Sequence, residues 1–434
     1  RLLRFVLPCI GTMLFTSIYG IVDGLCVSNF VGKTAFAAVN LIMPLPMLLG
    51  TIGFMLGTGG SAIVGITLGE GDQKKADRYF TLFLLAALVS VSVLAVLGIV
   101  FLRPIAVLLG AKGELLDYAV RYGRILMVSL PTFALQNMFQ SFFVTAEKPH
   151  LGFWFTVGAG CTNMVLDVLM VGIWGWGVEG AAIATFISQL VGGVLPVFYF
   201  IDRSNSSRLH LCKTSFYSKV LRDACINGSS ELMTNLSMSL VNILYNFQLL
   251  RLAGENGVAA YGVIMYAAFL FVAVFVGYAV GSAPIVSFHY GARNHAEVHN
   301  LYRKSLRLIA VVAVTLTLAS MFIIPCVARI FVGYDAELLA LTSRAFRLYA
   351  LSFLIMGFNV YASSFFTALG DGVTSALISF LRTLAFQVIA ILLLPLLLGI
   401  DGIWLAVTAA ELAALAVSAA MLLTKDKVFH YRKV

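Results

Sequence analysis

Apolar residues follow one another in this chain over lengths that are typical of membrane-spanning helices. Residues 81–102 and 308–322 contain no charged side chain, and a transmembrane helix needs about 20 mostly apolar residues. The runs lack the apolar–polar alternation of a membrane β-barrel, and helices are the other structure that satisfies its backbone within lipid. The pattern therefore predicts an all-α integral membrane protein with twelve transmembrane helices, at residues 5–30, 35–68, 79–102, 117–146, 150–172, 177–201, 219–250, 257–290, 301–324, 339–368, 373–398 and 401–424.

Small residues recur along the chain at a constant spacing of 222 residues. Gly59 corresponds to Gly281 and Gly69 to Gly291, and a Thr-Ala pair and a Gly-x-x-Gly motif follow the same spacing. One offset in several separate stretches is not expected from chance similarity between apolar segments. Transporters often contain such repeats, with the substrate site between them. We predict two pseudo-symmetric six-helix lobes, joined by a polar cytoplasmic linker; their residues are 1–201, 202–218 (linker) and 219–434.

The composition supports a membrane protein, and the basic residues indicate its orientation. Hydrophobic residues make up 60% of the chain and charged residues 11%, against roughly a quarter charged in soluble domains. If both termini face the cytoplasm, 19 Lys and Arg residues lie inside and 9 outside, with Arg382 within a span. This bias predicts a multi-pass protein of the cytoplasmic membrane with both termini inside. The net charge of +9 then requires no nucleic-acid partner.

The chain shows no pattern that is typical of an enzyme or a cofactor protein. Its six cysteines form no CxxC pair, and most lie in or beside apolar runs, where Cys acts as a small hydrophobe. His295-Ala-Glu-Val-His299 differs from the zinc motif HExxH, so we interpret this stretch as a solvated cytoplasmic loop. We expect the first apolar run to be a retained span rather than a cleavable signal, because it carries an acidic residue.

Ionisable side chains within spans are costly and are therefore candidates for function. Asn163 and Asp167 are spaced i, i+4, which places them on one helix face. Counted from the turn near Gly175, Asp167 and Thr185 lie roughly 9–12 Å below the outer surface, and Asp23 lies at a similar depth in the first span. Four oxygen-bearing side chains at one level suit a small hard cation such as Na⁺, or the carboxylates could carry a proton. The alternative is that Asn163 and Thr185 only bond across helices.

Three further charged residues lie within predicted spans of the second lobe. Glu231 follows two serines near mid-membrane in the seventh span, and both a functional and a structural role remain open for it. Glu411 and Arg382 could be partners across neighbouring spans, or each could face a water-filled cavity. We favour a structural role for these two.

The residues considered together resemble the multidrug and toxic compound extrusion (MATE) family over essentially the whole chain. The resemblance lies in Val22-Asp23, Gly59-x-Ser61, Asn163-x-x-x-Asp167 and Thr367-Ala368-x-Gly370, and it is closer to the bacterial members. It implies two six-helix lobes facing each other in a V, with a large central cavity. It also implies antiport by alternating access, in which Na⁺ or H⁺ enters and an amphipathic, often cationic, drug-like compound leaves.

The resemblance also assigns roles to individual residues. Asp23, Asn163, Asp167 and Thr185 match the cation site of the N-terminal lobe in prokaryotic members. Glu231 matches an acidic position that some members use in the C-terminal lobe. Pro8 matches a proline associated with bending of the first helix, although a plain N-terminal helix proline is the simpler interpretation. No cofactor is implied beyond the coupling ion, and the expected partners are small substrates and the bilayer around a monomer.

The repeat predicts an asymmetry between the lobes. The 222-residue offset maps the four cation-site candidates onto residues that cannot hold an ion, namely Tyr245, Ala385, Ile389 and Val407. We therefore expect the ion in the N-terminal lobe alone, with Glu231 less important than Asp23 or Asp167.

Two alternatives to a drug exporter remain. One is a lipid-linked oligosaccharide flippase of the same superfamily, for which a basic cavity is expected. The other is an intramembrane enzyme, for which no motif appears in a span.

Overall fold

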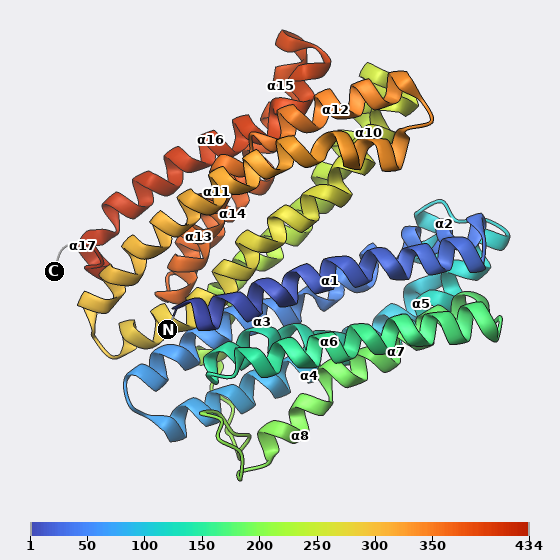
Figure 1. Cartoon of the computed structure of the whole chain (residues 1–434). Helices are drawn as coiled ribbons and strands as arrows, with labels where there is room; N and C mark the ends of the chain where they lie inside the picture. The colour runs from blue at the N-terminus through green and yellow to red at the C-terminus, as the bar shows by residue number, and fades with distance from the viewer. Residues whose placement is uncertain (1, 433–434) are drawn as a thin grey trace.

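The computed structural model describes residues 2–432, and every regular element in this part of the chain is a helix. Two helical bundles lie side by side at the end that carries both chain termini, and they diverge toward the opposite end (Figure 1). The first bundle consists of α1 (Leu2–Phe30), α2 (Lys33–Ile42), α3 (Pro44–Gly69), α4 (Gln73–Leu108), α5 (Glu114–Thr145), α6 (Pro149–Leu166), the π-helical segment η1 (Asp167–Ile173), α7 (Gly177–Gly193) and α8 (Leu195–Ile201).

The second bundle repeats this arrangement with different interruptions. It consists of α9 (Ser218–Asn227), α10 (Ser229–Gly291), α11 (His295–Val332), α12 (Ala336–Ala350), α13 (Phe353–Ala368), α14 (Gly372–Phe380), the π-helical segment η2 (Leu381–Ala385), α15 (Phe386–Leu398), α16 (Ile400–Thr424) and the short α17 (Asp426–Phe429).

The helices provide the twelve spans that the apolar runs predict. Within residues 2–432, nine helices are long and apolar enough to cross a membrane, and α12 with α13, bent by 45°, makes a tenth. The remaining two are α5 and the first half of α10, which are long but carry more polar side chains. α10 contains two spans because Gly254 breaks it with φ 62° and ψ −148°, a conformation that glycine adopts without steric strain.

Two predicted spans are less continuous than the sequence indicated. The span expected at residues 35–68 is divided between α2 and α3, where Pro44 and Pro46 supply no backbone N–H to the helical ladder. The span expected at residues 219–250 is divided at Gly228, between α9 and α10. α3, α9 and α10 lie at the interface between the bundles, whereas α2 packs within the first bundle.

The glycines of the sequence repeat occupy the contact between the two bundles. A Cβ atom on Gly69 would overlap with the carbonyl oxygen of Phe288, and one on Gly291 would overlap with that of Ile66. Phe288 is the repeat equivalent of Ile66, so the two contacts are related by the internal symmetry. These positions accept only hydrogen as a side chain because α3 and α10 cross backbone against backbone.

Residues between α8 and α9 form no regular structure but are held against the start of α4. The backbone N–H of His210 donates to Asp77 Oδ1 (3.0 Å), that of Cys212 donates to Thr81 Oγ1 (3.1 Å), and the Thr214 hydroxyl donates to the Arg78 carbonyl (2.8 Å). The predicted linker therefore follows the surface of the first bundle.

The segment His295–His299 is not the loop that the sequence indicated. It forms the first turn of α11, because Asn294 caps the helix by accepting the Glu297 backbone N–H (3.1 Å). His299 Nδ1 lies 2.9 Å from the Tyr431 carbonyl oxygen. Among the residues that the structure describes, no group of three or more His, Cys, Asp or Glu side chains is arranged to hold a metal ion.

Candidate functional site

The four predicted cation ligands converge within the first bundle from α1, α6, η1 and α7. Asp23 lies in the last third of α1, Asn163 in the last turn of α6, Asp167 at the start of η1, and Thr185 in the middle of α7. Asn163 Nδ2 donates to Thr185 Oγ1 (3.4 Å). The carboxyl groups of Asp23 and Asp167 are close enough to share a hydrogen bond when one of them holds a proton.

Close packing of α1 against α6 makes this convergence possible. Gly160 faces Phe15 so closely that a Cβ atom would overlap with the phenyl ring. Asp167 follows about two turns after Gly160, just beyond the end of α6, and Asp23 follows about two turns after Phe15 along α1. The small residue therefore brings the acidic end of α1 to the level of the Asp167 carboxyl group.

The ligand set contains buried oxygens that lack a donor. Asp167 is fully buried and Asn163 is 2% exposed. In the described part of the chain, no hydrogen-bond donor reaches Asp23 Oδ1, Asn163 Oδ1 or either carboxylate oxygen of Asp167. Buried acceptors are nearly always satisfied in folded proteins, and hard oxygen ligands with a carboxylate suit a small hard cation. A proton on one carboxyl would satisfy part of the same need.

Asn163 and Thr185 form a hydrogen bond between α6 and α7. This contact is the one expected if the two residues only connect neighbouring helices. Thr185 Oγ1 itself donates to the Ala181 carbonyl oxygen (3.0 Å), so it is tied back to its own helix. The pair nevertheless leaves Asn163 Oδ1 available as an acceptor. Interhelical bonding and ion binding are therefore compatible at this position.

The π-helical geometry after Asp167 was not predicted from the sequence. The backbone N–H of Trp174 donates to the Leu169 carbonyl oxygen (2.8 Å), five residues earlier. Such segments occur often at functional sites, where they change the direction of side chains. The helix is still α-helical between Asn163 and Asp167, because the Asp167 backbone N–H donates to the Asn163 carbonyl oxygen.

A cavity of about 770 Å³ lies mainly within the second bundle, with contributions from α2, α3 and α5. Its volume is in the range of drug-binding sites. Its charged lining residues in the described chain are Glu231, Arg382 and Glu411. Tyr245 and Tyr261, whose rings stack at 4.9 Å between centroids, supply part of the aromatic wall. None of the four cation ligands, all within residues 2–432, lines this cavity.

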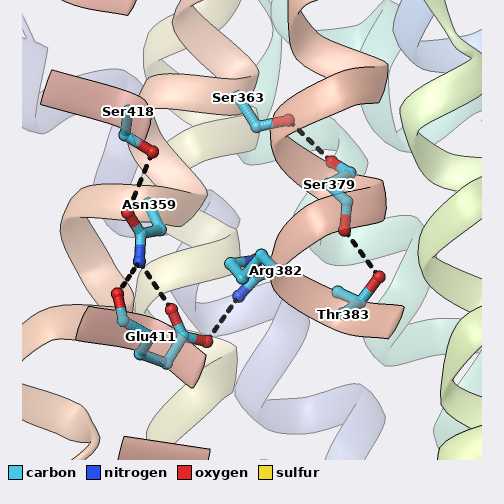
Figure 2. Close-up of polar contacts among 7 residues, drawn as sticks. All are labelled: Asn359, Ser363, Ser379, Arg382, Thr383, Glu411 and Ser418. Atoms are coloured by element: carbon cyan, nitrogen blue, oxygen red, sulfur yellow. Dashed lines mark hydrogen bonds and ion pairs between the residues drawn. The ribbon is translucent and has the colours of Figure 1, made fainter. Parts of the chain in front are cut away.

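Arg382 and Glu411 form an ion pair at the cavity wall, which confirms the prediction that they could be partners. Arg382 Nη1 lies 3.1 Å from Glu411 Oε1, and the two side chains are 13% and 1% exposed. Asn359 Nδ2 donates to Glu411 Oε2 (2.7 Å), and the Ser418 hydroxyl donates to Asn359 Oδ1 (2.9 Å). Figure 2 shows this chain of contacts, from Ser418 on α16 to Asn359 on α13, back to Glu411 on α16, and on to Arg382 in η2.

The sequence did not single out Asn359 or Ser418. Asn359 is the one amide side chain within the apolar run of α13, and that feature could have marked it as a bonding partner across helices.

Pro8, the helix-bend candidate, lies within α1, which continues through it without a break. The Thr12 hydroxyl donates to the Pro8 carbonyl oxygen (2.9 Å). The role of Pro8 in bending remains a prediction.

Known proteins resemble this chain in both sequence and fold. The MatE family model matches residues 8–169 and 232–393. The multidrug export protein MepA of Staphylococcus saprophyticus is 21% identical over 431 residues, which cover 98% of this chain and 94% of that protein.

Two solved structures illustrate the similarity in fold. A MATE protein in complex with MaL6 superposes with a TM-score of 0.94 at 22% identity, covering 99% of this chain and 96% of that one. A multidrug resistance MATE family transporter of the MOP superfamily, in an outward-facing conformation, superposes with a TM-score of 0.93 at 22% identity and the same coverage. At this identity the structural likeness concerns the fold alone.

Proposed function

The chain belongs to the MATE family of membrane transporters, and on that premise we propose that it exports amphipathic, often cationic, drug-like compounds in exchange for Na⁺ or H⁺. The exchange takes place by alternating access across the cytoplasmic membrane. The similarity of the chain to a protein named as a multidrug export protein, MepA, supports the proposal of a broad range of substrates. Membership of a transporter family also separates the chain from intramembrane enzymes.

The observation that carries this proposal is the separation of two sites with different chemistry. The first bundle holds an acidic pair with buried oxygens that lack donors, which suits a cation. The cavity of about 770 Å³ lies mainly in the second bundle and is lined by aromatic and apolar side chains together with many hydroxyl and amide groups, which suits an amphipathic compound. A coupled exchanger needs both kinds of site, whereas a channel or uniporter needs no buried acidic pair.

α1 provides a physical connection between the two bundles. Its last third carries Asp23, and its first third packs on α10, where a Cβ atom on Gly281 would lie 2.8 Å from the Cα of Val6. Pro8 lies beside this contact. A cation at Asp23 and Asp167 changes the charge along α1, and we propose that this change favours a different bend near Pro8 and so alters the cavity wall.

The charges of the cavity support drug export over flipping of a lipid-linked oligosaccharide. A phosphate-bearing substrate would be held by basic residues without counter-charges. Arg382 is the only basic group among the cavity-lining residues of the described chain, and Glu411 neutralises it. Glu231 adds a further acidic group to the wall, which suits a cationic substrate.

We further propose that both termini and residues 202–218 face the cytoplasm, as the distribution of Lys and Arg indicates. The bundles meet at the end that carries the termini and diverge at the opposite end (Figure 1), so with this orientation the state is an outward-facing one. The pseudo-symmetric lobes are residues 1–201 and 219–434, and the transporter acts as a monomer.

The test is transport by purified protein in liposomes with Na⁺ and proton gradients imposed separately. Rhodamine 123, a fluorescent amphipathic cation, serves as the substrate. We expect one of the two gradients to drive its accumulation against a concentration difference, and the other ion to give downhill exchange only. Equal transport with and without either gradient would show that the protein is not a coupled antiporter.

A further inference from the structure

The second bundle contains a set of ligand groups that parallels the candidate cation site of the first. The first bundle combines a carboxylate, an amide and a hydroxyl from Asp167, Asn163 and Thr185. Around Glu411, the second bundle combines the same three groups, with the amide from Asn359 and the hydroxyl from Ser418. The residues are not equivalents in the sequence repeat, so the similarity is one of chemistry.

The two sets differ in what satisfies their carboxylates. Both oxygens of Asp167 lack a donor in the described chain. Both oxygens of Glu411 have one, because Oε1 accepts from Arg382 (3.1 Å) and Oε2 accepts from Asn359 (2.7 Å). The guanidinium of Arg382 therefore neutralises the Glu411 carboxylate, as a bound ion would neutralise the Asp167 carboxylate.

We propose that Arg382 is a built-in cation of the C-terminal lobe: its guanidinium pairs with the Glu411 carboxylate, which Asn359 and Ser418 hold in place, and excludes Na⁺ or H⁺ from that carboxylate. This inference rests on the proposed coupling of transport to a cation, and it identifies Arg382 as the residue that confines ion binding to the N-terminal lobe. Arg382 acts through Glu411 and is a positioning residue for ion specificity.

The location of Arg382 supports this role over that of a simple structural tie. Arg382 lies in η2 and lines the cavity, so an ion from the cavity would reach Glu411 if the guanidinium were absent. Its bond to Glu411 uses one N–H of the five that a guanidinium carries, and its buried Nε has no partner in the described residues. A tie selected for stability alone would engage more of these donors, because buried ion pairs stabilise only when well satisfied.

Glu231 and four tyrosines line the same cavity and enter the design of the test. Glu231, Tyr245, Tyr261 and Tyr266 lie on α10, and Tyr349 lies on α12. Glu231 is retained in every variant, so that a gain in ion binding can be assigned to Glu411 by substitution. The tyrosines carry no charge in neutral buffer, since a free tyrosine titrates near pH 10.

The experiment measures ion binding by the purified full-length protein in the Asp167→Asn background, which removes the proposed N-terminal site. ²²Na⁺ binding at equilibrium reports sodium, and infrared difference spectra report a protonated carboxyl group. We expect Asp167→Asn alone to bind no cation. Adding Arg382→Gln should restore one equivalent, seen either as bound ²²Na⁺ or as a protonated carboxyl, and adding Glu411→Gln as well should remove it.

Arg382→Lys in the same background is the matched control, because it retains the positive charge and should bind no cation. Arg382→His keeps the test decisive if the glutamine variant does not fold. The histidine protein can be purified in acidic buffer with its imidazole charged, and its ²²Na⁺ binding should appear only as the buffer is made alkaline.

Three results would overturn the inference. The first is that Arg382→Gln and Arg382→His gain no cation in either the wild-type or the Asp167→Asn background. The second is a gain that survives Glu411→Gln. The third is a gain of equal size with Arg382→Lys. A wrong assignment of the coupling site would give a different result. Asp167→Asn would then bind as much cation as wild type. The effect of Arg382→Gln would still be measured as the difference in bound cation between the proteins with and without this substitution.

Discussion

The acidic site of the first bundle and the acidic site of the second use similar groups and reach opposite states. Asp23 and Asp167 face each other without a basic partner, and several of their oxygens lack donors. Glu411 is paired with Arg382 and bonded to Asn359. The comparison teaches that a repeated scaffold need not repeat the chemistry of its buried acids. Under the proposal above, the ion binds in the lobe whose carboxylates are left without a counter-charge.

The π-helical segments extend this comparison. Each bundle has one, in corresponding spans: η1 follows α6, and η2 separates α14 from α15. η1 begins with Asp167 and η2 carries Arg382. These are not repeat-related positions, because the 222-residue offset maps Asp167 onto Ile389. The equivalent spans of the two bundles thus contain π-helical segments at different positions. One segment carries an acidic residue, Asp167, and the other a basic residue, Arg382.

Removing one charge from each site should have opposite effects on stability. Arg382→Gln leaves Glu411 buried without its partner, and such a change typically lowers the free energy of unfolding by about 3–5 kcal/mol. Asp167→Asn removes a buried acidic group that has no basic partner, so it should leave stability unchanged or raise it. Chemical denaturation in detergent, followed by circular dichroism, measures both. Equal destabilisation by the two variants would remove the distinction between the sites.

Asn359→Ala should have a smaller effect of the same sign as Arg382→Gln. It leaves Glu411 Oε2 and the Glu411 carbonyl oxygen without a bond from the Asn359 amide, and an unsatisfied buried acceptor costs about 1–3 kcal/mol. Ser363→Ala is the control on the same helix, since the Ser363 hydroxyl bonds to Ser379 (2.9 Å) and not to a charge (Figure 2). If the control destabilises as much as Asn359→Ala, the Asn359–Glu411 contact has no special importance.

Asp167→Asn should abolish export against a gradient. For one-to-one exchange of a monovalent cation, a tenfold ion gradient, about 1.4 kcal/mol, can sustain about a tenfold substrate gradient. The variant should bring rhodamine 123 only to equal concentrations on both sides, with the protein still folded by size-exclusion chromatography. Glu231→Gln should retain a substrate gradient. Full accumulation with Asp167→Asn would exclude this residue from coupling.

The side of the membrane that each end of the bundles faces can be tested without changing either site. Ser206 is exposed in the segment between α8 and α9. In a background lacking the six native cysteines, Ser206→Cys should be protected from impermeant thiol reagents in intact cells and should react after permeabilisation. Labelling in intact cells would place this segment outside and reverse the proposed orientation.

Much of the fold follows from the sequence, because span length and hydropathy are local properties. The convergence of the candidate ligands in the first bundle could be predicted in part, since Asp23 and Asp167 are acids within apolar runs and i, i+4 spacing placed Asn163 beside Asp167. The contact of Asn359 with Glu411 could not, because it joins helices 52 residues apart and depends on how α13 packs against α16. Likewise, the loop expected at His295–His299 is helical because the Asn294 cap outweighed the polar composition.

The central claim is that the coupling ion binds in the N-terminal lobe alone, and equilibrium binding of the ion to single-site variants tests it most directly. ²²Na⁺ binding, or proton release if the ion is H⁺, should be lost with Asp23→Asn and retained at one equivalent per chain with Glu231→Gln. If Glu231→Gln abolishes ion binding while Asp23→Asn leaves it intact, the ion binds in the other lobe and the claim is wrong.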